Sequence, residues 1–302
     1  MRIAHINNIS GVSSIIAEEQ LKQGHSADVF VFNRTSHSQF GGIKLNYKSP
    51  FTMWRFLKRL GREYDVWHYH YPYGSLKKSL EMLLRKSKKH KAYLKHYHGD
   101  DLRDKFDEDF CLVSTPDLLK FAPNGKWLPN PVETSKIKNI VKKKVESYPL
   151  KIAHYPHYAS MKKYADKYRE VARSLGQLED EGKCKVVTIA NVPHDAALRS
   201  IADCDIVLGK LDLGWFGKFE LEGMALGKPI VCNVAEELYG KYHPPIYRST
   251  ITTFERDLRR LLDDEHTRSQ LSSQGTEYVT KNHSPDVVCN ILLTYYAQAS
   301  ST

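Results

Sequence analysis

Apolar and polar positions along the chain follow two alternating spacings. Short apolar runs bounded by polar residues or glycine predict β-strands, and apolar residues at every third or fourth position predict helices. In the first half of the chain, strands are predicted at residues 1–7, 27–33, 64–71, 91–99 and 110–114. Helices are predicted between them at residues 13–23, 51–62 and 75–89. This rhythm predicts a parallel sheet covered by helices.

The rhythm starts again after the sequence Pro-Asn-Pro at residues 129–131 and a basic run at residues 136–144. The second set of predicted strands covers residues 151–155, 184–190, 205–211 and 229–234. The second set of predicted helices covers residues 161–175, 194–202, 217–226 and most of the chain from residue 253.

We therefore expect an α/β protein with two Rossmann-like domains, residues 1–147 and 148–302. Their parallel sheets would face each other across a cleft, because ligands of open α/β sheets bind at the carboxyl ends of the strands. The last helix can cross back to the N-terminal domain.

Length and composition fit such a globular protein, with 302 residues of which 41% are hydrophobic. No apolar run reaches the about 18 residues that predict a membrane span. The N-terminal segment lacks the apolar core of a signal peptide. The five cysteines are scattered without CxxC pairs, which favours free thiols in a reducing compartment. We expect a cytoplasmic protein.

The excess of positive charge lies entirely in the first half of the chain. Residues 1–147 carry 26 Lys and Arg against 15 Asp and Glu, whereas residues 148–302 carry 19 against 20. This asymmetry indicates an anionic partner for the first half only. No groove-reading motif accompanies the charge, so we expect no nucleic-acid partner.

The predicted helix at residues 51–62 interleaves aromatic and basic side chains. Such a face fits peripheral contact with the cytoplasmic surface of a membrane, or with a lipid-linked or anionic glycan acceptor. The alternative is that Trp54, Phe56 and Leu57 pack inward and the basic residues only solvate one face of the helix.

Several common motifs are missing. Only Gly11 stands where a dehydrogenase carries GxGxxG. Residues 223–229, GMALGKP, resemble a phosphate-binding loop, but the spacing is one residue short and a proline replaces the Ser or Thr that holds magnesium. His68 with His70, and His96 with His98, are pairs that share one face of a strand and could bind zinc. We favour the alternative that one member of each pair lies at a polar cleft edge, and predict no metal.

Residues 205–229 predict a strand, a loop bounded by Gly214 and Gly217, and a helix. The first turn of such a helix presents backbone N–H groups and the positive end of the helix dipole, which suit a diphosphate. Glu222 lies about one and a half turns into the helix, where a carboxylate can accept hydrogen bonds from a ribose diol. An ordinary strand–helix unit with a surface glutamate would show the same pattern.

Segments along nearly the whole chain resemble retaining glycosyltransferases with the GT-B fold, of the glycosyltransferase family 4 type. The matching segments are, in order, RIAHINNISGV, YDVWHYHYP, HYHGDDLR, VSTPDLLKFAPNGKWLPNPVE and GWFGKFELEGMALGKP. The resemblance implies transfer of a sugar from a nucleotide-diphosphate sugar to an acceptor, with retention at the anomeric carbon. It also implies that no metal or other cofactor takes part.

The resemblance assigns donor-binding roles. Glu222 matches the glutamate that binds the donor ribose. The loop from Gly214 to Gly217, which includes Trp215 and Phe216, would hold the donor sugar and phosphates through backbone amides. Gly11 matches the loop near the diphosphate, and Val192 falls where nucleobase contacts lie.

The resemblance also identifies His98, Lys162 and Glu222 as catalytic residues. His98 matches the histidine next to the transferred sugar, and Lys162 matches the lysine that neutralises the leaving diphosphate. At two positions the chain departs from the family. Gly214 replaces the first glutamate of an E-x7-E pattern, and Ala159 replaces an arginine that precedes the lysine.

These departures motivate an alternative function, a catalytically impaired protein that still binds a nucleotide sugar. Another enzyme of the GT-B type, such as a sugar epimerase, is a further alternative.

Overall fold

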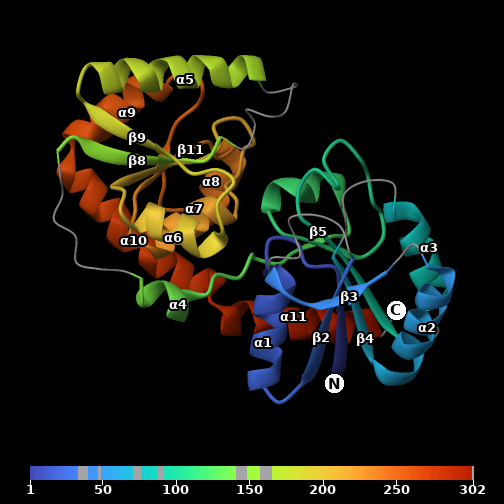
Figure 1. Ribbon diagram of the computed structural model, residues 1–302. Helices are drawn as coiled ribbons and strands as arrows, with labels where there is room; N and C mark the ends of the chain where they lie inside the picture. The colour runs from blue at the N-terminus through green and yellow to red at the C-terminus, as the bar shows by residue number, and fades with distance from the viewer. Residues whose placement is uncertain are drawn as a thin grey trace. The chain divides into compact units, whose positions relative to one another are not determined.

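The computed structural model describes residues 1–32, 40–46, 49–70, 76–87, 91–140, 148–156 and 165–300. The chain forms two compact units: the first comprises residues 1–131 and 283–302, and the second comprises residues 132–282. The units therefore divide after Pro131 rather than after residue 147, and the C-terminal segment packs with the first unit (Figure 1).

In the described part of the first unit, seven parallel strands form one sheet in the order β3-β2-β1-β4-β5-β6-β7. The strands are β1 (Arg2–Ile6), β2 (Ser26–Phe32), β3 (Ile43–Leu45), β4 (Val66–His70), β5 (Ala92–Tyr97), β6 (Cys111–Val113) and β7 (Lys126–Trp127). The helical elements are α1 (Val12–Lys22), α2 (Pro50–Glu63), α3 (Leu76–Ser87), the 3₁₀ helix η2 (Pro116–Phe121) and α11 (Pro285–Ser300).

Side chains that alternate along the strands fill two separate cores, one on each face of this sheet. Ala4 and Trp67 belong to the core that also contains Phe56 and Leu60 of α2. Their neighbours Ile3 and Val66 point to the opposite face, into a core shared with α1 and α11. Helix α11, drawn in red, packs against α1 and β5 (Figure 1).

In the second unit, five described parallel strands lie in the order β12-β11-β10-β8-β9. They are β8 (Leu150–His154), β9 (Cys184–Thr188), β10 (Ile206–Leu208), β11 (Ile230–Cys232) and β12 (Tyr247–Arg248). The helices are α4 (Thr134–Lys138), α5 (Ala165–Asp180), α6 (His194–Ala202), α7 (Lys218–Ala225), α8 (Glu236–Tyr242), α9 (Phe254–Asp263) and α10 (Glu265–His283).

Helix α7 approaches its sheet closely because Gly223 lacks a side chain. A Cβ atom added there would come within 2.9 Å of Val207 and of Ile230. The second half of α7 therefore packs directly on β10 and β11.

The two parallel sheets confirm the predicted fold class, an α/β protein with two Rossmann-like halves. Short elements such as β3, β12 and α8 were not predicted, because they are too short to show a period. The five cysteines are buried and not joined in disulfides. Among the described residues, no helix combines the length and the apolar character needed to cross a membrane.

Candidate functional site

The loop between β10 and α7 is held by a glutamate that the sequence did not single out. Glu220 is 1% exposed. Its two carboxylate oxygens accept hydrogen bonds from the backbone N–H groups of Lys210, at 3.0 Å, and Gly217, at 2.8 Å. The carboxylate thus ties together both ends of the loop. Because the N–H of Gly217 is used in this way, it is not offered to a ligand.

Two positions near the ends of the loop favour glycine, each for a different structural reason. Gly209 must lack a side chain, because a Cβ there would lie 2.6 Å from Cγ of Glu220. Gly214 has φ of 75° and its carbonyl accepts a hydrogen bond from the N–H of Ala235. A glutamate at position 214 would be strained in this left-handed conformation, which is consistent with its replacement by glycine.

Trp215 and Phe216 lie in the interior, with 3% and 1% exposure. Their rings stack on each other with centroids 4.5 Å apart, and Phe216 also contacts the ring of Tyr278. Their side chains therefore anchor the loop to the core. Any contact that these two residues make with a donor would come from the backbone, as the resemblance implies.

Glu222 lies on α7 with 6% exposure, beside two basic side chains. Its Oε1 atom is 2.7 Å from Nε2 of His194 and 3.7 Å from Nζ of Lys218. His194 begins α6, directly after the loop that contains the exposed Val192. The structure thus brings Glu222 next to the loop after β9, and it adds His194 and Lys218, which the sequence did not suggest.

A further cation lies at the start of α7. A Cβ atom added at Gly217 would come within 2.9 Å of Nζ of Lys210, so this ammonium group lies next to the backbone of Gly217. Lys210 and Lys218 therefore place two positive charges near the N-terminal end of the helix, where the helix dipole also favours an anion.

Gly11 follows β1 at the carboxyl edge of the first sheet and precedes α1. Its φ is 78°, and a Cβ there would lie 2.8 Å from the ring of Phe40. Both the backbone conformation and the space available require glycine at this position.

His98 follows β5 at the same edge, in a turn built by Asp101. The carboxylate of Asp101 accepts hydrogen bonds from the N–H of His98, at 2.8 Å, and from the N–H of Gly99, at 2.7 Å. Arg103 then donates to Asp117 at 2.7 Å, which ties the turn to η2. These hydrogen bonds hold the backbone of His98 in the turn that follows β5.

Both ring nitrogens of His98 have protein partners. Nε2 lies 3.1 Å from Nδ1 of His70, and Nδ1 lies 2.8 Å from Oγ of Ser114. The expectation that one histidine of each pair lies at a polar edge is wrong for the first pair, because His68 and His70 are both fully buried. Burial lowers the pKa values of His68, His70 and His96 well below their ordinary range.

The nitrogens of these histidines are close enough to bind a metal ion. Two groups, His5–His68–His70 and His70–His96–His98, each have ligand atoms within 4.8 Å of one another.

The predicted catalytic residue Lys162, together with Ala159, lies outside the described residues.

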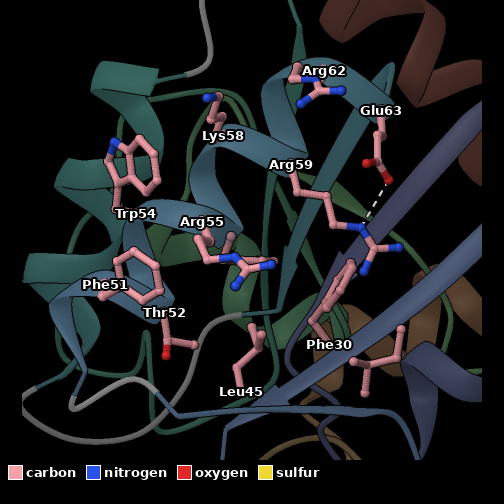
Figure 2. Close-up of a pocket in the computed structure, with 12 residues that line it drawn as sticks. Phe30, Leu45, Phe51, Thr52, Trp54, Arg55, Lys58, Arg59, Arg62 and Glu63 are labelled. Atoms are coloured by element: carbon pink, nitrogen blue, oxygen red, sulfur yellow. Dashed lines mark hydrogen bonds and ion pairs between the residues drawn. The ribbon is translucent and has the colours of Figure 1, made fainter.

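Helix α2 carries the predicted basic and aromatic surface (Figure 2). Phe56 packs inward with 4% exposure, whereas Phe51 and Trp54 are 64% and 56% exposed. The inward packing considered for Trp54 is therefore wrong. The guanidinium of Arg55 lies 5.7 Å from the Phe51 ring centroid, and the Lys58 ammonium lies 5.1 Å from that of Trp54.

These side chains line an open pocket of about 560 Å³ against β2 and β3. Arg59 closes its far end, where it lies over the ring of Phe30 at 5.4 Å and forms an ion pair with Glu63 at 2.9 Å. Figure 2 shows the basic and aromatic side chains on one side of α2.

No protein-family model matches the sequence, and no curated protein matches it. The structure is similar to a sucrose-phosphate synthase from Thermosynechococcus elongatus, with a TM-score of 0.63, 13% identity and complete coverage of both chains. A glycosyltransferase from Rickettsia africae gives a TM-score of 0.61 at 11% identity, with 99% of this chain and 98% of that chain covered.

A UDP-GlcNAc 2-epimerase from Methanocaldococcus jannaschii gives a TM-score of 0.54 at 10% identity, with 98% of this chain and 100% of that chain covered. At such low identities the similarity establishes the fold. The chain therefore has the two-domain α/β fold of the GT-B glycosyltransferases and related enzymes.

Proposed function

We propose that the protein is a glycosyltransferase that transfers a sugar from a nucleotide-diphosphate sugar to an acceptor, with retention of the anomeric configuration and without a metal ion. The observation that carries this proposal is the environment of Glu222. A nearly buried carboxylate, held by His194 at 2.7 Å, lies on α7 of a GT-B fold. Its Oε1 atom is already engaged, so Oε2 would accept the hydrogen bonds of a ribose diol.

The charges around the start of α7 support binding of the diphosphate. Developing negative charge on a leaving nucleotide diphosphate is stabilised by fixed cations and by helix N-termini. Lys210 and Lys218 provide two such cations here. We propose that Lys210 and Lys218 share this task with Lys162. The two additional cations would offset the absence of an arginine at position 159, which is Ala159.

In the first unit, we propose that His98 contacts the transferred sugar and that Gly11 lets the backbone approach the diphosphate. His98 is the partly exposed member of its histidine pair, since His96 is 1% exposed. We also propose that Val192, which is 45% exposed before α6, contacts the nucleobase.

The test begins with the wild-type chain and a panel of UDP-, GDP-, ADP- and dTDP-sugars, screened by thermal shift in EDTA. A ligand at 100 times its Kd stabilises a protein by about 2.7 kcal/mol, which raises the melting temperature by several degrees. Turnover is then measured as release of nucleoside diphosphate, and the configuration of the product is read from its anomeric proton by NMR.

The variants Glu222→Gln and Glu237→Gln are compared with the wild type. Glu237 is an exposed glutamate of α8 in the same unit and is the matched control. We expect the first variant to lose turnover and the second to retain it. Tight binding without turnover would support the impaired binding protein instead, and an epimerised free sugar would support an epimerase.

On the acceptor side, we propose that the exposed surface of α2 contacts an anionic membrane that carries a lipid-linked acceptor. The support is the combination of exposed Phe51 and Trp54 with Arg55 and Lys58, in the half of the chain that holds the excess positive charge. Aromatic rings favour the membrane interface, and each basic residue adds about 1 kcal/mol near an anionic surface.

The test is co-sedimentation with phosphatidylglycerol vesicles at low salt, with phosphatidylcholine vesicles as the neutral comparison. Binding should fall in Trp54→Ala and should not change in Trp127→Phe, whose ring packs partly buried in the first unit. Failure of the wild type to sediment with the anionic vesicles would refute membrane contact.

A further inference from the structure

Five histidines gather on one face of the first sheet, beneath α1 and α11. On β1, β4 and β5 this face is apolar at first, with Ile3, Val66 and Leu94 in the core. Toward the carboxyl ends it changes to histidine, at positions 5, 68, 70, 96 and 98. The strand pairing places His5 beside His68 and His70 beside His96. Buried imidazoles are costly unless both nitrogens have partners, so their hydrogen bonds must be accounted for.

The first part of the hydrogen-bond path runs from α1 across the sheet. Nε2 of His5 lies 2.9 Å from Oε1 of Gln20, and Nδ1 of His5 lies 3.1 Å from Nε2 of His70. Nδ1 of His70 lies 3.1 Å from Nε2 of His98. Nδ1 of His98 then lies 2.8 Å from Oγ of Ser114.

The second part returns to the starting point. Oγ of Ser114 lies 3.0 Å from Nε2 of His96, and Nδ1 of His96 lies 3.2 Å from Nε2 of His68. Nδ1 of His68 lies 2.8 Å from the hydroxyl of Tyr296, to which the amide of Gln20 donates at 3.4 Å. These eight side chains form a closed circle of hydrogen bonds, which we call the histidine ring.

If all five imidazoles are neutral, the hydrogen bonds of the ring are consistent only when all five share one tautomer. The path enters each imidazole at Nε2 and leaves it at Nδ1. With Gln20 oriented as it lies, its oxygen accepts from His5, and each link then requires the proton on Nε2. With the amide reversed, each link requires the proton on Nδ1. A charged imidazole would require the hydroxyl of Ser114 or Tyr296 to accept from both of its neighbours in the ring. Burial disfavours such a charge, because it lowers the pKa values of the four fully buried histidines, His5, His68, His70 and His96.

A ligand can reach the ring at one place. Seven of the eight members are at most 2% exposed, and His98 alone is partly exposed. A sugar hydroxyl that contacts a ring nitrogen of His98 must therefore replace either Ser114 or His70. Where the sugar hydroxyl replaces Ser114, the links from Gln20 through His5 and His70 still determine which nitrogen of His98 carries the proton.

We propose that the histidine ring is a positioning network that holds His98 neutral and in a single tautomer for contact with the transferred sugar. This role rests on the proposed glycosyltransferase function, whereas the ring itself does not. Tyr296 and Gln20 are then positioning residues for His98, although they come from α11 and α1 and are themselves fully buried.

The first experiment needs no substrate. Long-range ¹H–¹⁵N NMR spectra of the wild-type chain at pH 7.5 report the tautomer of each histidine. We expect His5, His68, His70, His96 and His98 to be neutral and to share one tautomer. Mixed tautomers, a charged member, or one equivalent of zinc bound by the purified protein would overturn the ring.

The second experiment opens the ring by Tyr296→Phe, which removes one hydroxyl. The matched control is Tyr295→Phe on the same helix, because the Tyr295 hydroxyl donates to the carbonyl of Trp127 and lies outside the ring. We expect Tyr296→Phe to mix the histidine tautomers and to lower kcat by about tenfold or more through loss of orientation, with the donor KM changed less than twofold. Tyr295→Phe should change neither.

Gln20→Met opens the ring at the neighbouring link and should repeat these effects if Tyr296→Phe does not fold. Unchanged kcat in a variant with mixed tautomers would refute the positioning role. If the wild type transfers no sugar from any donor, the proposed function fails while the NMR result still decides whether the ring exists.

Discussion

Replacing Glu220 should loosen the loop that precedes α7. The carboxylate is nearly inaccessible to solvent and accepts the backbone N–H groups of Lys210 and Gly217 at 3.0 and 2.8 Å. In Glu220→Ala both amides lose their partner, and the space beside Gly209 opens. In Glu220→Gln one oxygen remains, but the side-chain NH₂ group meets one of the two backbone donors.

The expected loss of stability follows from these two contacts. A hydrogen bond to a charged group contributes about 1.5–3 kcal/mol. Because the loop is half-buried, water can partly replace the lost acceptor, so we expect the free energy of unfolding to fall by about 3 kcal/mol in Glu220→Ala. Glu220→Gln should lose about half as much. Glu237→Ala removes an exposed glutamate from α8 and should change stability by less than about 0.5 kcal/mol.

Urea unfolding followed by circular dichroism measures these differences, and hydrogen exchange locates them. The amides of Lys210 and Gly217 should exchange faster in Glu220→Ala, while those of β9 should not change. A loss below 1 kcal/mol, or continued protection of both amides, would show that Glu220 does not hold the loop.

Two further predictions concern the first unit. Gly11→Ala should lower the free energy of unfolding by about 1–2 kcal/mol, because φ is 78° and the ring of Phe40 leaves no room for a Cβ atom. The control is Gly61→Ala within α2, where a Cβ atom meets nothing within 4 Å and should raise the free energy of unfolding by up to about 1 kcal/mol. Urea midpoints measure both changes, and equal effects of the two substitutions would contradict the reasoning. Acid should destabilise the fold, because burial lowers the pKa of His5 from 6.5 to about 4. Between pH 6.5 and pH 4 the unfolded chain therefore binds more protons than the folded chain. The contribution of His5 to the free energy of unfolding is complete above pH 6.5 and falls by about 3 kcal/mol toward pH 4. A free energy of unfolding that does not change over this pH range would exclude a neutral buried His5.

The alternation of apolar strands and amphipathic helices was enough to predict two parallel sheets. The division of the chain between the two units was harder to predict. Residues 285–300 read as a helix, but their local pattern does not show that Tyr296 packs in the first unit beside Gln20. Contacts between residues so far apart in sequence depend on tertiary packing.

The candidate site shows a similar limit. Glu222 could be found from its segment, whereas Glu220 could not, because two glutamates two positions apart on a helix point in different directions and only the structure shows which faces the loop. The sequence also did not show that the side chain of Trp215 lies in the core, so that only its backbone could contact a donor. The i,i+2 histidine pairs predicted a shared face, yet the ring also needs the strand order β1-β4-β5, which places His5 beside them.

Calorimetric titration of the nucleoside diphosphate of the responding sugar, in EDTA, tests the central claim most directly. The wild type and Glu237→Gln should bind it at one site with equal affinity. Glu222→Gln should bind at least about tenfold more weakly, because a charge-assisted hydrogen bond to the ribose contributes about 1.5–3 kcal/mol. Equal affinity of Glu222→Gln and the wild type would contradict the assignment of this strand–loop–helix as the donor site.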